Sequence, residues 1–532
     1  MNVMEVLTGL TSHTWTLFVA AVLLYVVWWV QKRRHQHSVF ARLGIPFVPP
    51  HLIYGSNHVL RAPGALATDI IAKWTKQYGK VFGYYVGWRP TLVVADLDLV
   101  KQVLIKDFNN FSNRPKLVID AQPVVDTVVG LRDQRWKDVR AVLAPTFSMV
   151  KMKHMAGIIN RKIDQLMTIV EEKTAQGQPV EWYSTYQGLT LDVISECALA
   201  MQTNCQRDQE KDEFLVAVRE FLQNAVNPAI LLALYFPVFA SLLSFVSNKL
   251  AVSGRMTQMI VNHLKKVIAI RRKDLETRYV DVLQLMLEAA QSRYSQADGQ
   301  VANGAAEPEA AKVKPRHTLL TDAEIIANAW VFMLGGFETT ASTLTYTTYL
   351  LATHPQVQDR LYQEVCDVAQ KGESGSLTYE QVRDLKYLDQ VITESLRLYP
   401  PVVTFISREA AHDFKLGNIS VPKDMIITVP IWQLHRDPDQ WRDPETFDPD
   451  RFSPDAKAAE SHHPMSYLPF GAGPRNCPGM RFAQLEAKLT LARVIKTYRL
   501  EVCKETPVPL TFKIPTVAIN PSKAVYIKVV PR

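Results

Sequence analysis

The chain has 532 residues, of which 47% are hydrophobic and 21% are charged, proportions that exclude a disordered or collagenous chain and indicate a globular protein with a large core. The net charge of +8 comes from basic residues spread along the chain, which favours anionic membrane surfaces or acidic protein partners over nucleic acid. The five cysteines are too few and too irregularly spaced for a disulfide framework or a CxxC zinc site, which indicates a reducing compartment.

An apolar stretch near the N-terminus has the length and the flanks of a membrane anchor. It covers residues 15–30, extends back towards residue 7, and is followed directly by Lys32–Arg34. With the preceding turn it can cross the endoplasmic reticulum bilayer, about 27 Å thick. A basic C-terminal flank keeps that side in the cytosol, and a basic leader and a small-residue cleavage site are both missing. We therefore expect a transmembrane signal anchor over residues 7–31 in the endoplasmic reticulum membrane, with the rest of the chain facing the cytosol.

A short spacer and one large domain are predicted after the anchor. Residues 32–50 are basic and proline-rich, and Pro46, Pro49 and Pro50 cannot continue a helix. We expect this segment to be a semi-rigid spacer. The globular domain is predicted over residues 51–532.

Within this domain, strand signals are sparse and helical periodicity dominates. Residues 80–94 predict two strands around a turn at residues 87–90. Residues 291–317 are poor in large apolar side chains and are predicted to be a flexible surface loop. They could instead link two domains, but the chemistry expected after them needs Trp136 and Arg140 from before them. We therefore predict a single domain.

A second apolar stretch, residues 228–246, is nearly long enough to span a membrane. Pro237 interrupts it, and a second crossing would move everything after it into the lumen. We expect it to lie in the bilayer interface or to line a substrate entrance. A buried core helix is the alternative.

Residues 321–354 predict one long helix. Thr321 and Glu324 form a capping box, Pro355 marks the end, and the helix would be about 50 Å long. Such a length is typical of a helix that crosses a whole domain.

The middle of this helix carries the sequence GGFETT, residues 335–340. A glycine inside a helix costs about 1 kcal/mol, so a pair of them indicates close approach of another group. Glu338 and Thr339 offer an acid and a hydroxyl that can transfer protons. An incidental glutamate in a buried helix is the plain alternative, which the cost of an unpaired buried carboxylate disfavours.

The segment Phe470–Gly479 reads FGAGPRNCPG and surrounds one cysteine with turn-forming residues. Gly471 and Gly473 allow a tight turn under a flat ligand. Cys477 would be a thiolate stabilised by backbone N–H groups and by the positive end of a helix over residues 481–495.

This loop resembles the haem-binding loop of the cytochrome P-450 family, and other segments resemble further family motifs in the same order. The family's E-x-x-R helix is matched by Glu394 and Arg397, whose charge cluster Arg451 would complete. The segment GGFETT resembles the family's oxygen-binding helix. RDQRWKDVR resembles the W-x-x-x-R segment that clamps a haem propionate. The match extends over essentially the whole chain after the anchor.

The resemblance implies a mostly α fold with a smaller β portion and a haem b cofactor between the long helix and the cysteine loop. Cys477 would bind the haem iron, and Phe470 would pack beside its sulfur. Propionates would be held by a set of four residues: Trp136, Arg140, Arg408 and Arg475. For Arg408, the spacing from the preceding Pro400 is one residue longer than expected in near relatives.

The implied activity is that of a monooxygenase that inserts one oxygen atom from O2 into an apolar small molecule, a lipid, steroid or xenobiotic. Electrons would come from NADPH through a flavoprotein reductase, with a b-type cytochrome as a further candidate donor; membrane lipid is an expected partner and nucleic acid is not. The nearest branch contains drug- and steroid-oxidising enzymes and thromboxane synthase, so an isomerase that rearranges a prostaglandin endoperoxide without electrons is the alternative. The presence of Glu338 and Thr339 favours the monooxygenase, because proton transfer depends on such groups. It also disfavours a haem-binding sensor that performs no turnover.

Overall fold

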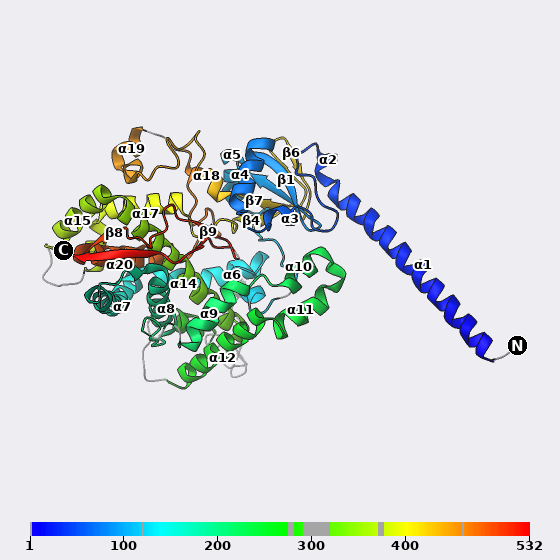
Figure 1. Cartoon of the computed structure of the whole chain (residues 1–532), viewed down its shortest axis with the longest axis horizontal. Coiled ribbons are helices and arrows are strands. Elements are labelled where there is room, and N and C mark those ends of the chain that lie inside the picture. Colours follow the sequence, from blue (N-terminus) through cyan, green and yellow to red (C-terminus); the bar gives the residue numbers. More distant parts are fainter. Residues whose placement is uncertain are drawn as a thin grey trace, which may run out of the picture.

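The computed structural model describes residues 3–532 except residues 120, 208, 210, 275–280, 291–319, 371–376, 460–461 and 516. The protein is mostly helical with a smaller β portion, as the sequence predicted, and one long helix projects from it (Figure 1). The predicted flexible loop over residues 291–317 lies outside the described residues.

The β portion includes a four-stranded sheet of order β1-β2-β7-β4. The predicted hairpin is confirmed as β1 (Val81–Val86) and β2 (Arg89–Val94), which pair antiparallel around Gly87. Strand β7 (Ile426–Thr428) adds parallel to β2, and β4 (Ser407–Glu409) closes the sheet. The other strands form small sheets: β3 (Val180–Glu181), β5 (Phe414–Leu416), β6 (Ile419–Val421), β8 (Tyr498–Glu501), β9 (Phe512–Lys513), β10 (Asn520–Pro521) and β11 (Tyr526–Pro531).

The helical body is built around α14 (Asp322–Thr353), whose predicted capping box forms between Thr321 and Glu324. It packs against α8 (Trp182–Leu199), α17 (Lys386–Leu398) and α20 (Met480–Thr497). Most of its side chains are buried, so α14 is a central helix that crosses the domain.

The remaining helices surround this centre. Long ones are α4 (Ala67–Tyr78), α6 (Asp133–Leu143), α7 (Met149–Ala175), α9 (Glu213–Asn224), α12 (Val252–Lys273) and α15 (Pro355–Ala369). Short ones are α2 (Val39–Leu43), α3 (Asn57–Leu60), α5 (Leu97–Lys101), α16 (Tyr379–Asp384), α18 (Ile431–Leu434) and α19 (Pro454–Ala459).

The N-terminal helix α1 (Val3–His37) is longer than the predicted anchor. The span from Thr14 to Leu43 is apolar and long enough to cross a membrane, and none of its most apolar window is buried. The segment over residues 32–50 differs from the predicted spacer, because helix continues to Leu43 and Phe40 is fully buried against Tyr85. The aromatic side chain of Phe40 fixes this segment to the sheet.

The second apolar stretch forms two short helices, α10 (Pro228–Tyr235) and α11 (Ala240–Lys249), with a break at Pro237. The helix pair is bent by 118° at this break. Large apolar side chains of this region are exposed, among them Val238 at 65%, Leu242 at 63% and Phe245 at 59%. This exposure is incompatible with the alternative of a buried core helix.

Candidate active site

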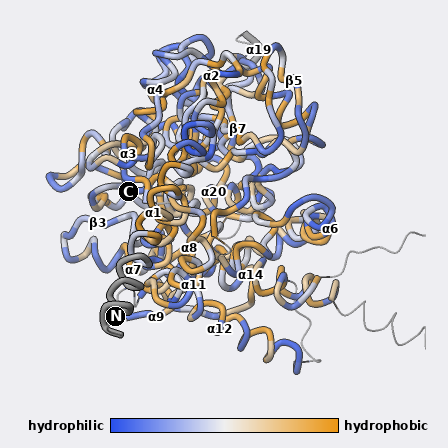
Figure 2. The backbone as a smooth tube through the Cα atoms, turned by 90° about the vertical axis from the view of Figure 1, so that its right-hand side faces the viewer, coloured by the Kyte–Doolittle hydropathy of each residue, from blue (hydrophilic) through white to orange (hydrophobic). Residues whose placement is uncertain are grey.

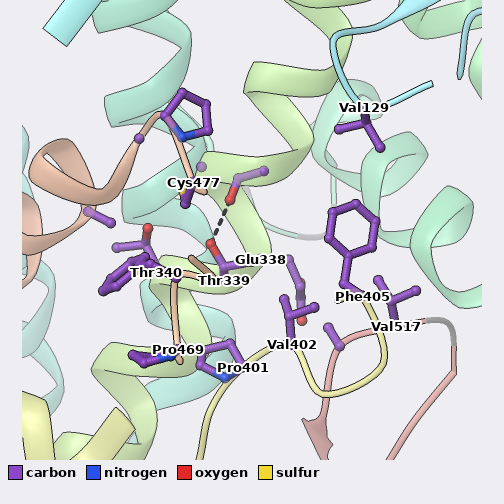
Figure 3. Close-up of a pocket in the computed structure, with 18 of the residues that line it drawn as sticks. Val129, Glu338, Thr339, Thr340, Pro401, Val402, Phe405, Pro469, Cys477 and Val517 are labelled. Atoms are coloured by element: carbon purple, nitrogen blue, oxygen red, sulfur yellow. Dashed lines mark hydrogen bonds between the residues drawn. The ribbon is translucent and has the colours of Figure 1, made fainter. Parts of the chain in front are cut away.

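A cavity lies between α14 and the loop that carries Cys477. Its apolar wall includes Val129, Val402, Phe405 and Val517, which come from segments far apart in the sequence. Figure 3 shows Cys477 on one side of the cavity and Phe405 with Val517 on the other. All eight residues that the sequence predicted for the site line this cavity: Trp136, Glu338, Thr339, Arg140, Arg408, Phe470, Arg475 and Cys477.

The cysteine loop holds its sulfur by backbone hydrogen bonds. The Cys477 N–H donates to the Phe470 carbonyl at 2.9 Å, which closes the turn. Burial raises the pKa of the Cys477 thiol, while the Gly479 N–H and Arg140 act in the opposite direction. Helix α20 begins at Met480, one residue before the predicted start, so its N-terminal end lies close to the sulfur.

At position 473 of the cysteine loop, both the backbone conformation and the available space require glycine. It adopts a φ of +71°, and a Cβ there would lie 2.0 Å from the Leu104 carbonyl oxygen. Because Gly473 has no side chain, the loop can turn here and can also lie in close contact with the backbone of Leu104.

Four arginines, Arg114, Arg140, Arg408 and Arg475, line the cavity close enough to repel one another. Burial, and then repulsion from neighbouring arginines that include Arg408, lowers the pKa of Arg475 to about 9. Burial lowers the pKa of Arg408 to about 10. Among the described residues that line the cavity, the only acidic side chain is Glu338, so no carboxylate of this lining pairs with the arginine cluster.

Several N–H groups of these arginines are buried without a hydrogen-bond acceptor among the described residues: Arg114 Nε, Arg408 Nε and Arg475 Nη1. A buried donor without an acceptor costs about 1–3 kcal/mol. A flat dianion whose two carboxylates reach these groups would satisfy them and offset part of the positive charge of the cluster. The cavity therefore fits the two propionates of a haem that lies beside Cys477.

Arg114 was not predicted from the sequence. Its Nη1 donates to the Phe405 carbonyl at 2.6 Å, and its guanidinium lies 3.8 Å from the centre of the Phe405 ring. The sequence around it, FSNRP, has no periodicity that predicts a site. Only the fold brings Arg114 to a partner 291 residues away.

Trp136 and Arg140 lie on the same side of α6, as their spacing predicted. The Arg475 guanidinium stacks on the Trp136 ring at 4.1 Å from its centre. The Arg140 Nη2 group donates to the main-chain and side-chain oxygens of Asn476, each at 3.0 Å. Helix α6 is thereby joined to the cysteine loop.

The two glycines of α14 have different surroundings. A Cβ at Gly335 would meet no atom within 4 Å, because this residue faces the cavity. A Cβ at Gly336 would lie 2.8 Å from the Ile194 side chain of α8. One glycine thus widens the cavity, and the other allows the two helices to pack closely.

Glu338 and Thr339 are neighbours in sequence but do not share a hydrogen bond in the structure. The Thr339 hydroxyl donates to the Gly335 carbonyl at 2.6 Å. The buried Glu338 carboxylate instead accepts from the Tyr183 hydroxyl and from Gln187 Nε2, both on α8. Burial raises the pKa of Glu338, and the bonds from α8 oppose this shift. Proton transfer between the two residues would need a bridging water or a turn of the carboxylate.

Near the site, α20 contains a buried glutamate, Glu486, for which the described residues provide no hydrogen-bond partner. Glu486 is fully buried, and neither of its carboxylate oxygens has a hydrogen-bond partner among the described residues. Burial raises the pKa of Glu486 well above its usual range, so the folded state favours the protonated form. The contribution of protonated Glu486 to the free energy of unfolding is complete at pH values below the pKa of this side chain in the unfolded chain, near 4.3. This contribution decreases as the pH rises above that value.

Glu486→Gln is therefore expected to make unfolding less dependent on pH. Relative to the native chain, the variant should gain about 1.4 kcal/mol of unfolding free energy per pH unit between the unfolded and folded pKa values of Glu486. Urea denaturation at pH 6 and pH 8 measures this gain. The exposed Glu505→Gln is the matched control, and an equal pH dependence in both variants would contradict the prediction.

Comparison with known proteins agrees with this geometry. The sequence model of the family described as Cytochrome P450 matches residues 45–529. Thromboxane-A synthase of Sus scrofa is 35% identical over 536 residues, which cover 97% of each chain. Cytochrome P450 3A29 of Sus scrofa is 32% identical over 532 residues, 99% of each chain, and Cytochrome P450 3A56 of Fundulus heteroclitus is 32% identical over 528 residues, 98% of this chain and 99% of the other. A cavity lined by one thiol and a cluster of cations, in a chain that matches these enzymes over nearly its whole length, identifies the protein as a haem enzyme of the cytochrome P450 family.

Proposed function

We propose that the protein is a monooxygenase that converts an apolar R–H compound, O2, two electrons and two protons into R–OH and water. The observation that carries the proposal is the Thr339 hydroxyl on the cavity wall, next to a residue, Glu338, that can exchange protons. The largely apolar lining supports a lipid, steroid or xenobiotic substrate.

Cys477 would bind the haem iron, with Phe470 beside the sulfur. The propionates would be held by Trp136, Arg140, Arg408 and Arg475, to which the geometry adds Arg114. When bound, the haem supplies the redox chemistry that activates O2. The protein contributes a largely apolar cavity, fixed cations and proton-exchanging groups.

Within this path, Thr339 would present a hydroxyl at the reacting face of the cavity. Glu338 would deliver protons to it after release from Tyr183 and Gln187. Arg219 lies close enough to lower the pKa of Glu338, and its Nε donates to Gln187 at 2.8 Å. The cluster on α8 and α9 would thus control how readily the acid gives up its proton.

Thr339→Ala is expected to lower the product formed per NADPH consumed by about a hundredfold, the usual contribution of a positioned proton donor. The measurement is product and NADPH consumption with reductase present. Thr345→Ala is the matched control, because its hydroxyl also donates to a carbonyl four residues earlier but does not line the cavity. Equal coupling of electrons to product in both variants would exclude a role for Thr339.

An endoperoxide isomerase is the second candidate, favoured by the 35% identity to thromboxane-A synthase. The two reactions differ in their need for electrons. Product that forms only with O2, NADPH and a reductase supports the monooxygenase. Turnover of a prostaglandin endoperoxide without electrons, unaffected by Thr339→Ala, would support the isomerase.

A flavoprotein reductase, with a b-type cytochrome as a further donor, is the proposed electron source. Exposed cations flank the Cys477 loop: Lys106 follows the segment that contacts Gly473, Lys137 is on α6, and Arg481 is in the first turn of α20. An acidic protein surface would be complementary to these charges.

We propose that residues 7–31 anchor the protein in the endoplasmic reticulum membrane and that the catalytic domain, residues 51–532, faces the cytosol. The apolar α1 and the basic residues that follow it support this orientation. In Figure 2, the part of α1 that is drawn in colour is largely hydrophobic, and in Figure 1, α11 lies at the end of the molecule from which α1 projects. The exposed side chains of α11 would enter the lipid interface.

A further inference from the structure

Arg33 is a buried cation at the end of the membrane anchor. Only 2% of its surface is exposed, although Lys32 and Arg34 on either side of it are exposed. Its guanidinium lies 5.0 Å from the centre of the Trp29 ring on the same helix. A charge at this depth needs polar partners, because an isolated buried cation is costly.

The partners of Arg33 are main-chain carbonyls of two other segments. Nη1 donates to the Ile53 carbonyl at 3.2 Å, and Nη2 donates to the Tyr235 carbonyl, at the end of α10, at 2.7 Å. The planar guanidinium fork allows one side chain to reach both carbonyls, which a lysine ammonium cannot do with the same geometry. Arg33 therefore joins α1, the segment before α3, and α10.

Aromatic contacts reinforce this joint. The Trp29 ring of α1 stacks on Phe236, at the break between α10 and α11, with 5.9 Å between ring centres. Tyr54 packs edge-on against Tyr235 at 5.1 Å. The joint thus fixes the bend at which the exposed apolar side chains of α11 begin.

The joint is also connected to the cavity. Helix α9 contributes Leu222 to the cavity wall, and α10 begins six residues later. In Figure 1, α10 and α11 lie at the same end of the molecule as α1. The anchor therefore contacts the segment that directly follows a helix of the cavity wall.

We propose that Arg33 locks the anchor to α10, so that α1 and the α10–α11 pair form one rigid lipid-binding surface and the bilayer holds the catalytic domain at a fixed angle. Without this lock, α1 would be a flexible tether, and α10–α11 would move independently of it. The inference rests on the proposed membrane anchoring, but it does not depend on which reaction the protein catalyses.

Arg33→Met in the full-length, haem-loaded protein in phosphatidylcholine bilayers tests the proposal. Hydrogen exchange of residues 228–249 should accelerate about tenfold, as expected when hydrogen bonds to a charged group are lost. In oriented bilayers, polarised absorption should report a broader distribution of haem tilt. Arg34→Met removes the same charge from the exposed neighbour and should leave both quantities unchanged.

The outcomes separate this proposal from the proposed function. If Arg33→Met keeps the native exchange rate and tilt, the lock does not exist, whatever the enzymatic activity. If Arg33→Met fails to bind haem, Trp29→Leu provides the second test, because it removes the ring that contacts both Arg33 and Phe236. Native exchange and tilt in Trp29→Leu would then overturn the proposal. If all variants and the native protein fail to associate with bilayers, the proposed anchoring is at fault.

Discussion

Replacing Cys477 with alanine is expected to abolish the red-shifted Soret band of the reduced, carbon-monoxide-bound protein and all turnover with it. Cys477 is the cysteine whose sulfur faces the cavity, accepts a hydrogen bond from the Gly479 N–H and lies near Arg140. Removing the sulfur removes the proposed iron ligand, whose electron donation favours O–O cleavage. No other described cysteine lines the cavity, so no other thiol is expected to replace Cys477 as the iron ligand in the variant.

Cys366→Ala is the matched control, because Cys366 is also partly exposed but lies on α15, away from the cavity. Spectra of both variants should be recorded at equal haem content. A native band in Cys477→Ala, or an equal loss in both variants, would contradict the assignment of Cys477 as the ligand. Because the band depends on ligation and not on turnover, the result is independent of the choice between monooxygenase and isomerase.

The parts of this fold that were predicted from the sequence depend on local rules. The α14 capping box and the helix after the cysteine loop follow from side chains within a few residues of the helix ends, and the starts of both helices were predicted to within one residue. The hairpin around Gly87 likewise needs only alternation and a turn. Membership in the family, and its haem, followed from one ten-residue loop and the order of the other motifs.

The parts that were not predicted depend on contacts between distant segments. The pairing of Glu338 with Tyr183 is set by how α8 packs on α14, more than 150 residues apart. Residues 32–50 contain three prolines and were predicted to be a spacer, but the burial of Phe40 fixes them to the sheet. A local sequence pattern does not predict which helix packs against a given acidic residue, or which side chain fills a space formed by distant segments.

Breaking the buried ion pair between Glu394 and Arg397 is expected to have the largest effect on folding. Both side chains are fully buried, and Arg397 Nε donates to Glu394 at 2.7 Å. Arg397 also donates to the carbonyls of His435 and Pro444, and Arg451 Nε lies 3.4 Å from Glu394. The pair therefore joins α17 to the segment that leads towards the cysteine loop.

Glu394→Gln would leave the Arg397 charge buried without its carboxylate, which should lower the free energy of unfolding by about 3–5 kcal/mol and prevent stable haem binding. Arg397→Lys keeps the charge but loses the fork that reaches several acceptors, so an intermediate loss is expected. The exposed pair of Arg360 and Asp450 is the matched control, since Arg360→Met should cost about 1 kcal/mol or less. Denaturation midpoints and haem content measure these effects. A desolvated charge without its partner is costly wherever water cannot enter the fold. If Glu394→Gln were no more destabilising than Arg360→Met, the Glu394–Arg397 pair would therefore not have the structural role that its complete burial implies.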